Sequence, residues 1–392
     1  MKVLVIAPQP FFSPRGTPFS VYYRTLVMSE LGCEIDLLTY GEGQDVDIPA
    51  VRILRIPHFK FLGPVKVGPS LLKLFLDKFV VLWTLALLCT RRYDAVHAHE
   101  ESIFFVRFLK PLFRFKLIYD MHSSLPQQLT NFGYTTSRLL IGIFTWLEDT
   151  CLATADAVIT ICPELADYAV PRMPNPARHY LIENSIFDEV RLKGAAAVAT
   201  DDGREWERQL PDGRPVVSYA GTFESYQGLE ILIAGFARAR ERHPDAFLLM
   251  VGGTPEQVAR YRNLARGLGL DGHYLFTGRL PQPAAKRLVR HSTVLTSPRS
   301  EGTNTPLKIY EQLAGGKPLV ATRILSHTQV LDERVCYLAD PDAESMGRAI
   351  AEALTGGSRR DALVAAALEL YEREYSRTAY TGKLRALIED LG

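Results

Sequence analysis

The sequence predicts an α/β protein built from two doubly wound, Rossmann-like parallel sheets. Short and almost continuous apolar runs alternate with stretches of helical periodicity, as in 2–7 followed by 19–31. Such runs are typical of central parallel strands that helices cover on both faces. A length of 392 residues also exceeds one ordinary core. The alternation stops between 187 and 214 and then starts again, so we predict two domains joined by a linker.

We place the first domain at 1–186, the linker at 187–214 and the second domain at 215–375. Glycines at 32 and at 315–316 are typical helix ends, and Pro211-Asp212-Gly213 is a turn that closes the linker. In the first domain, apolar runs predict strands at 2–7, 34–40, 51–56, 94–99, 116–119, 155–160 and 180–185, with helices near 19–31, 70–90 and 137–153. In the second domain we expect strands at 216–221, 247–251, 274–277, 294–296 and 318–321, with helices near 229–241, 256–268 and 306–314, and a tail helix near 376–391.

The overall composition excludes several classes of protein. The net charge is +1, so there is no bulk electrostatic basis for binding nucleic acid. The five cysteines are scattered without metal-ligand spacing, and we expect free thiols in a reducing, cytoplasmic compartment. The first apolar run is a short strand that ends at Pro8, not a signal peptide. The most apolar run, 79–90, is too short to span a bilayer.

The most informative segment is 297–322, with the sequence SPRSEGTNTPLKIYEQLAGGKPLVAT. A strand ends at Ser297, a loop of small and polar residues follows, and Pro306 fits the first turn of a helix. A loop that leads into a helix N-terminus offers free N–H groups, which suits a phosphate. Lys308 and Glu311 share one face of that helix. A cation beside a phosphate and a carboxylate for ribose hydroxyls together predict a nucleotide-sugar site.

This segment resembles the motif of the family 4 retaining glycosyltransferases, of the group 1 type and the GT-B fold. Glu301-Gly302 is similar to the first part of the motif, and 311–321 to the second part. Nine residues separate Glu301 from Glu311, where the family usually has seven. The resemblance implies that Glu311 holds the donor ribose and that Glu301 approaches the sugar. The implied contacts to the diphosphate and sugar are Gly302, Thr303, Asn304, Thr305 and Leu307.

The resemblance also implies an architecture for the whole chain. Two Rossmann-like domains would face each other across a cleft, with helix 376–392 returning to the first domain. Strand 94–99 and His122 resemble a family strand and a family histidine that contacts the donor sugar. Gly16 and Arg15 stand in a first loop that in the family faces the acceptor and the leaving phosphate.

Simpler interpretations of these first-domain residues stay open. His122 is also consistent with a hydrogen-bonded structural histidine, and Arg15 with a solvated loop charge. His97 and His99 fall on one face of their strand, where packing or capping is the simpler role. Asp201-Asp202 and the aspartates at 340 and 342 lie in linker or turn segments, so we predict no metal site there.

The resemblance fails at the residues that hold the diphosphate in the family. Segment 217–236 is similar to a family segment in which an Arg and a Lys hold the diphosphate, and Gly221 matches it. Thr222 and Gln227 stand where those two cations should be. The departing diphosphate builds up negative charge, which protein cations and amides must stabilise if no metal does. The candidate substitutes are, in order, Lys308, Arg15, Arg299 and Arg323.

We therefore predict a metal-independent retaining glycosyltransferase with no cofactor. Its donor would be a UDP- or GDP-sugar, because the turn at Arg279 and Leu280 resembles one that reads the base through its backbone. Its acceptor would be a glycan or a lipid-linked saccharide. The catalytic candidates are Glu301, His122 and Lys308.

Two alternatives remain. A non-catalytic nucleotide-sugar-binding or scaffold protein on a degenerate fold is favoured by Thr222 and Gln227. A nucleotide-sugar 2-epimerase is the other alternative, and the glutamate-loop motif argues against it.

Two segments predict contact with an anionic membrane at its inner face. Segments 58–67 and 109–116 mix aromatic residues, leucine and basic residues without an acid, and we expect both to be surface loops. The apolar helix 71–88 would add to this surface. The alternative is that the helix packs on its own sheet and that the loops cover it.

Overall fold

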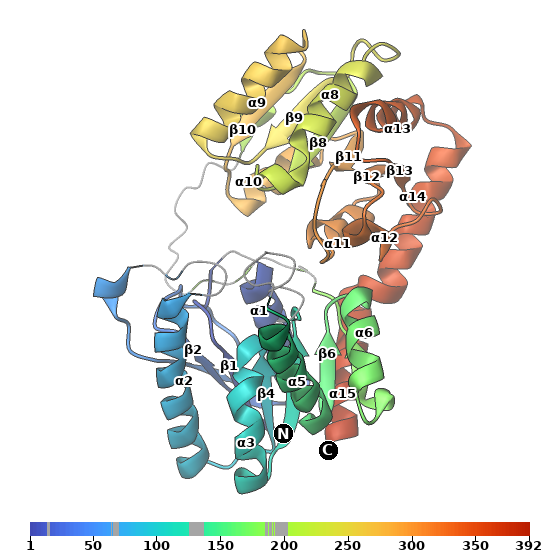
Figure 1. Ribbon diagram of the computed structural model, residues 1–392. Helices are drawn as coiled ribbons and strands as arrows, with labels where there is room; N and C mark the ends of the chain where they lie inside the picture. The colour runs from blue at the N-terminus through green and yellow to red at the C-terminus, as the bar shows by residue number, and fades with distance from the viewer. Residues whose placement is uncertain are drawn as a thin grey trace. The chain divides into compact units, whose positions relative to one another are not determined.

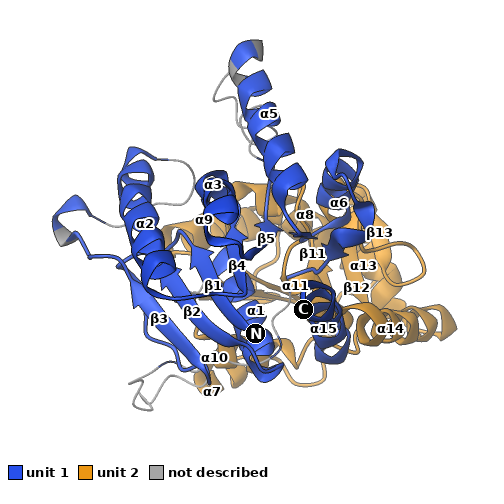
Figure 2. Ribbon diagram, turned by 90° about the horizontal axis from the view of Figure 1, so that it is seen from below, with its two compact units in different colours: residues 1–195, 376–392 blue, residues 196–375 orange. Residues whose placement is uncertain are grey.

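The chain folds into two compact units, each with its own parallel sheet (Figures 1 and 2). Unit 1 comprises Met1–Ala195 and Ser376–Gly392, and unit 2 comprises Ala196–Tyr375. This structure is a computed structural model, and the residues that it describes are 1–13, 16–63, 65, 70–124, 137–184, 187, 190, 192 and 203–392. The predicted fold class, two doubly wound α/β sheets, is confirmed.

Within the described residues, the sheet of unit 1 has the strand order β3-β2-β1-β4-β5-β6-β7, and its strands pair in parallel. The strands are β1 (Lys2–Ala7), β2 (Glu34–Thr39), β3 (Val51–Arg55), β4 (Ala95–His99), β5 (Lys116–Met121), β6 (Ala157–Thr160) and β7 (His179–Leu181). The helices are α1 (Gly16–Glu30), α2 (Leu71–Thr90), α3 (Ile103–Phe113), α5 (Arg138–Thr154), α6 (Pro163–Ala169) and α15 (Arg377–Leu391), with the short turns η1 (Lys60–Leu62), η2 (Glu100–Ser102), η3 (Val170–Arg172) and η4 (Pro176–Arg178).

The alternation of strand side chains divides the core of unit 1 into two layers. Leu4 and Ile6 of β1 pack on the side of α2, α3, α5 and α6. Val3 and Val5 pack on the opposite side, with α1 and α15. Leu384 and its neighbours in the tail helix are buried in this second layer. Both faces of the central strand are therefore covered, as its unbroken apolar sequence requires.

The sheet of unit 2 has the order β10-β9-β8-β11-β12-β13, again with parallel pairing among the described strands. The strands are β8 (Val216–Ala220), β9 (Phe247–Val251), β10 (Tyr274–Gly278), β11 (Val294–Ser297), β12 (Leu319–Thr322) and β13 (Tyr337–Ala339). The helices are α7 (Arg204–Glu207), α8 (Leu229–Ala239), α9 (Pro255–Gly267), α10 (Gln282–Val289), α11 (Lys308–Leu313), α12 (Leu325–Thr328), α13 (Ala343–Thr355) and α14 (Ser358–Leu370), with the turn η5 (Ser225–Gln227) and the π-helical turn η6 (Tyr371–Tyr375).

Two expectations about local structure are wrong. Helix α11 begins at Lys308 and not at Pro306, because the chain first makes a tighter turn in which the Ile309 N–H donates to the Pro306 carbonyl (3.0 Å). Residues 109–113 are not a loop but the end of α3. The buried Ile103 and Val106 hold this helix against the sheet, which offsets the cost of Pro111 in its last turn.

Parallel strands bring the candidate residues to one edge of each sheet. In unit 1 the carboxyl ends of β4 and β5 lead to His99 and His122. In unit 2 the carboxyl ends of β8, β10 and β11 lead to Thr222, Arg279 and the loop 298–307. Doubly wound sheets bind their ligands at this edge.

Candidate active site

Arg299 organises the loop that follows β11. Its guanidinium donates to the carbonyl oxygens of Glu301 (2.6 Å) and Asn304 (3.1 Å). Gly302 has a φ of 120°, and a Cβ on it would lie 2.3 Å from the Arg299 guanidinium, so glycine suits this position. Burial lowers the pKa of Arg299. These two hydrogen bonds hold the conformation of the loop after β11. Among the candidate substitute cations, Arg299 is therefore the one with a structural role in this loop.

The loop after β8 is fastened to the loop after β11. The Ser300 N–H donates to the Tyr226 carbonyl (2.9 Å). Gly228 permits this contact, because a Cβ on it would lie only 2.0 Å from the Pro298 carbonyl oxygen. The two loops together place Gln227 beside the first turn of α11.

Lys308 reaches the position of one missing cation. Its ammonium lies 3.4 Å from the side-chain oxygen of Gln227 and 4.1 Å from the centre of the Tyr219 ring. The Tyr219 hydroxyl donates to the carbonyl of Thr222 (2.7 Å), which is the position of the second missing cation. Burial, and to a smaller extent Arg299, lowers the pKa of Lys308 to about 7. The side chain is therefore a poorly solvated cation that a bound anion would stabilise.

Glu311 lies one helical turn after Lys308 and forms an ion pair with Lys286, a residue to which the sequence analysis gave no role. Its Oε1 is 3.1 Å from Nζ of Lys286 in α10. The side chains of Glu311 and Lys286 are 34% and 40% exposed, although Oε1 of Glu311 is itself buried. Glu301 is exposed in the loop. Arg323 instead forms ion pairs with Glu333 and Asp340.

A pocket of about 500 Å³ opens beside the ends of β9 and β10. The predicted residue Arg279 lines it, together with Gly253, Thr254 and Trp206 of α7. Leu280 packs against the adjacent hydrophobic cluster. Sequence reasoning missed Trp206 because it lies in the segment assigned to the linker. A lone tryptophan among charged residues at 204–208 is the pattern that could have identified it.

The other predicted residues of unit 2 lie at the same edge of the sheet. Gly221, Thr222 and Gly302 are exposed, whereas Thr303, Asn304, Thr305 and Leu307 are partly buried. The hydroxyl of Thr305 is buried and has no hydrogen-bond partner in the described part of the chain. It is therefore a buried polar group of the loop that leads into α11.

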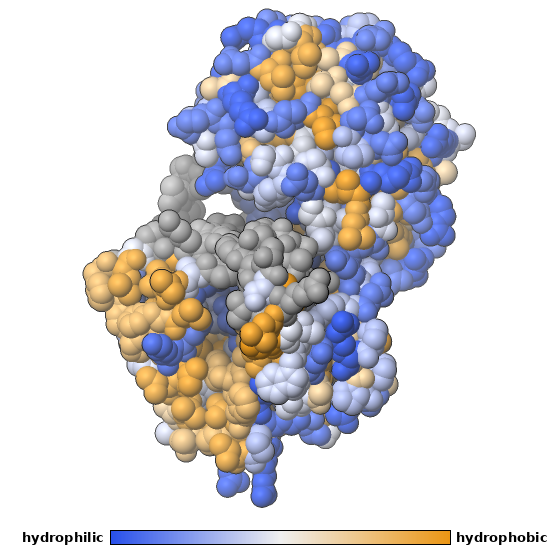
Figure 3. All heavy atoms as spheres, in the orientation of Figure 1, coloured by the Kyte–Doolittle hydropathy of each residue, from blue (hydrophilic) through white to orange (hydrophobic). Residues whose placement is uncertain are grey.

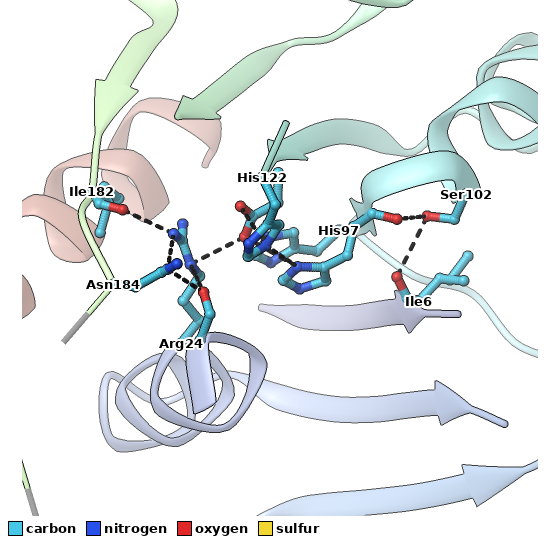
Figure 4. Close-up of polar contacts among 10 residues, drawn as sticks. Ile6, Arg24, His97, Ser102, His122, Ile182 and Asn184 are labelled. Atoms are coloured by element: carbon cyan, nitrogen blue, oxygen red, sulfur yellow. Dashed lines mark hydrogen bonds and ion pairs between the residues drawn. The ribbon is translucent and has the colours of Figure 1, made fainter. Parts of the chain in front are cut away.

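The histidines of unit 1 belong to a buried polar network around Asp120 (Figure 4). Strand alternation puts His97, His99 and Asp120 on the α1 side of the sheet, and His99 pairs with Asp120 across β4 and β5. One oxygen of Asp120 lies 3.0 Å from His97 Nε2 and 3.3 Å from His99 Nδ1. Its other oxygen lies 3.2 Å from His122 Nε2. The rings of His97 and His99 stack with centres 4.4 Å apart, so the expectation of one shared face is confirmed.

Arg24 of α1 neutralises Asp120. The two side chains are fully buried, with Nε of Arg24 3.1 Å from the carboxylate. Arg24 also donates to the carbonyl of Ile182 (2.8 Å) and to the side-chain oxygen of Asn184 (3.3 Å) (Figure 4). Burial alone would raise the pKa of Asp120, but Arg24 and the histidines outweigh burial and hold this pKa well below its usual range.

Burial also lowers the pKa of His97 and that of His99, so both rings are neutral near pH 7. His97, His99 and Asp120 have ligand atoms within 4.8 Å of one another and so form a possible metal triad. However, Asp120 already has Arg24 as its counter-charge. A divalent cation would add unbalanced positive charge in a buried site. We therefore interpret the cluster as a charge-balanced hydrogen-bond network.

His122 lies directly after β5 and is 4% exposed, at the end of this network. Gly16 is the exposed first residue of α1, and Arg15 lies outside the described residues. Sequence reasoning gave no role to Arg24 or Asp120. Each is a charged residue inside an otherwise buried run, and a buried charge requires a partner. That rule is the means by which both could have been found.

Comparison with known proteins identifies the family of this chain. The family model described as "Glycosyl transferase 4-like domain" matches residues 24–184, and the model described as "Glycosyl transferases group 1" matches residues 202–369. The D-inositol 3-phosphate glycosyltransferase of Corynebacterium efficiens is 32% identical over 316 residues, which are 76% of this chain and 72% of that protein.

The phosphatidyl-myo-inositol mannosyltransferase of Mycolicibacterium smegmatis is 22% identical over 381 residues, covering 95% of this chain and 90% of that protein. Among solved structures, Anabaena HepE in complex with UDP has a TM-score of 0.71 at 14% identity, covering 99% of this chain and 100% of that chain. The same protein has also been solved with UDP-glucose. Two matching family models and a relative above 30% identity lead to one conclusion: this chain belongs to the family 4, group 1 glycosyltransferases, and it is a glycosyltransferase of the GT-B fold.

Proposed function

We propose that this glycosyltransferase transfers a sugar from a nucleotide-diphosphate sugar, with Lys308 as the cation that stabilises the leaving diphosphate. The observation that carries this proposal is the ammonium of Lys308 at 3.4 Å from Gln227. A side chain from another helix thus occupies the place where the family resemblance predicts a lysine. A protein cation in this place supports a reaction that does not depend on a metal.

The nucleotide is assigned to unit 2. Glu311 accepts from the ribose hydroxyls, and the pocket beside Arg279 and Trp206 receives the base. The loop 302–305 donates backbone N–H groups to the diphosphate. HepE, which has the same fold, binds UDP and UDP-glucose, so UDP is the first nucleotide to test. His122 and Glu301 are assigned to the sugar.

The acceptor is assigned to the class of saccharides and lipid-linked saccharides. Two relatives are named for inositol acceptors, one a phosphate and one a phospholipid. Transfer with retention of the anomeric configuration completes the proposal. The test is a screen of sugar nucleotides by thermal shift, followed by product detection and by NMR of the product's anomeric proton. Absence of transfer from every sugar nucleotide would overturn the proposed donor class. A product with inverted anomeric configuration would overturn the retaining mechanism.

Changing Glu311 to Gln is expected to weaken nucleotide binding at least about tenfold, because hydrogen bonds to a charged group contribute roughly 1.5–3 kcal/mol each. Titration calorimetry with UDP measures the effect. Glu344→Gln is a matched control, since Glu344 is an exposed carboxylate of the same unit that also pairs with a basic residue. Equal affinity of Glu311→Gln and wild type would remove Glu311 from the site.

Trp206 is expected to report on the occupation of the base pocket. A base that stacks on an indole contributes about 1–3 kcal/mol, so UDP should quench the fluorescence of Trp206, and Trp206→Ala should weaken binding by at least about fivefold on this scale. The quench should persist when Trp83 and Trp146 of unit 1 are changed to Phe. A quench that survives in Trp206→Phe would place the base elsewhere.

A further inference from the structure

The outward side of unit 1 carries an unusual hydrophobic surface. The outward side chains of η1, α2 and α3 form a surface that we call the apolar face. Its residues are Phe61, Leu71, Leu74, Leu82, Phe108 and Leu112. Leu71 is 85% exposed, Phe61 81% and Leu112 73%. Figure 3 shows hydrophobic residues gathered over α2 and α3, which lie side by side on the same side of the sheet (Figures 1 and 2). A continuous apolar surface of this kind marks an interaction site.

Helix α2 exposes apolar side chains on its outer side as well as burying them on its inner side, which an ordinary amphipathic surface helix does not. Its inner side packs into the core through Leu76, Val80 and Leu88. Its outer side at Leu71, Leu74, Leu82 and their neighbours is exposed. The inner side of α2 is thus covered by the core, and its outer side is the part that lacks a partner within the described chain.

Most of the exposed charges around the apolar face are basic, and the exception near its end is Asp94, whose carboxylate accepts from the Lys2 N–H. Lys78 is exposed in the middle of the outward side of α2, and Arg92, Arg114 and Lys116 are exposed beyond the ends of α2 and α3. The single acid of α2, Asp77, faces inward and accepts from the Tyr40 hydroxyl (2.6 Å). Helix α3 contains no acid. A hydrophobic surface with a basic rim is complementary to a bilayer with anionic headgroups.

We propose that unit 1 docks on anionic lipid through this face, with α2 lying flat in the headgroup region. A helix of 20 residues is about 30 Å long, so both Leu71 and Arg92 would reach the surface. Among the described residues, no helix is long and apolar enough to cross a membrane. A second copy of the chain is the weaker occupant, because a symmetric pair would bring the same cations together, while the one acid of α2, Asp77, is held by Tyr40 and α3 has none.

Docking in this way has a consequence for the reaction. Turn η1 and the first residue of α2 follow β3, so they lie at the carboxyl edge of the sheet, the edge that also bears His99 and His122. A lipid-linked acceptor in the bilayer would thus be presented at the correct edge of unit 1. This consequence, and not the docking itself, rests on the proposed function.

Co-sedimentation of the full chain with vesicles tests the proposal. The protein should pellet with vesicles that contain phosphatidylglycerol, less so at high salt, and remain in solution with phosphatidylcholine alone. Leu82→Glu should lower the partition coefficient at least about tenfold, because a carboxylate then replaces a buried apolar contact. Lys78→Glu should lower it by about fivefold or more, the effect of one basic residue.

Matched controls separate docking from misfolding. Leu325→Glu changes an equally accessible leucine of unit 2, 51% exposed against 56% for Leu82, and Arg348→Glu changes an exposed arginine of unit 2. Both controls should pellet like wild type. Lys78→Glu is an exposed change between good helix formers, so it tests the proposal even if Leu82→Glu does not fold.

Cys89 offers a direct optical readout. It is exposed at the end of α2, whereas the other four cysteines are buried. A polarity-sensitive fluorophore on Cys89 should shift to the blue with anionic vesicles. The same fluorophore on Leu268→Cys, in a Cys89→Ser background, should not shift, because Leu268 is exposed in unit 2.

Three results would overturn the proposal. The protein could stay in the supernatant with anionic vesicles at low salt, or Leu82→Glu could pellet like wild type. Sedimentation velocity could show a dimer that Leu82→Glu dissociates, which would make a second copy the occupant. UDP affinity measured on the same samples keeps this test apart from the proposed function. A wild-type protein that binds UDP but not anionic vesicles refutes docking alone. A wild-type protein that binds the vesicles but not UDP refutes the nucleotide site alone.

Discussion

Replacing Lys308 with Met is expected to lower turnover by about 100-fold or more, which is the effect of removing one preorganised stabiliser of transition-state charge. The methionine keeps most of the volume beside the Tyr219 ring and removes the charge. The loss should appear in kcat with a smaller change in KM, because the diphosphate gains its charge as it leaves. Initial rates with the donor found in the screen measure the effect.

A matched substitution and a rescue make this result specific. Lys317→Met is the control, since Lys317 is a partly buried lysine of the same unit whose ammonium donates to main-chain carbonyls. Adding Gln227→Lys to Lys308→Met should recover part of the turnover, because the side chain of residue 227 lies beside the lost ammonium, with Oε1 of Gln227 3.4 Å from it. Normal turnover of Lys308→Met would transfer the role to another cation.

The protonation of Lys308 gives an independent check. Burial lowers its pKa to about 7, and a bound diphosphate should raise this pKa again. Below pH 7 the amine of Lys308 is already protonated in the protein without UDP, so UDP binding should be accompanied by little proton uptake. Above pH 7 the uptake should approach one proton, and affinity should fall as the pH rises. Calorimetry in buffers of different ionisation enthalpy measures the uptake, which Lys308→Met should abolish.

Changing Asp120 to Ala is expected to destabilise unit 1 by about 3–5 kcal/mol, the cost of leaving a buried charge without its partner. Arg24 would keep its hydrogen bonds to Ile182 and Asn184 but would lose the fully buried carboxylate 3.1 Å away. At about 2–4 °C per kcal/mol for a unit of this size, the melting temperature should fall clearly. Thermal unfolding followed by circular dichroism measures it.

The exposed pair Arg348–Glu344 provides the comparison, since breaking it should cost at most about 1 kcal/mol. Replacing both Arg24 and Asp120 with Leu should cost less than Asp120→Ala alone, because no unpaired charge remains. A loss for Asp120→Ala no larger than that for Glu344→Ala would mean that Arg24 and Asp120 are not an ion pair in solution. Asp120→Asn, which keeps the shape, should also lower turnover if the network orients His122.

The parallel sheets were predictable because their determinants are local. An unbroken apolar strand such as 247–251 and a glycine stop such as Gly32 act on their own neighbours, so the alternation of elements could be read along the chain. The positions of Glu311 and of loop 302–305 at a sheet edge followed in the same way. Helix α3 was missed at 109–113, because its stability comes from packing on the sheet and outweighs the local effect of Pro111.

The electrostatics of the site could not be predicted in this way. The sequence by itself determined that two expected cations are absent at Thr222 and Gln227, and it made Lys308 a candidate to replace them. Only the tertiary structure decided that Lys308, which is 81 residues from Gln227 in the chain, places its ammonium beside it. Arg24 reaches Asp120 in the same manner, from a helix to a strand far along the chain. Charge pairing depends on distance in space, and sequence periodicity specifies which face a residue lies on but not which distant residue meets it there.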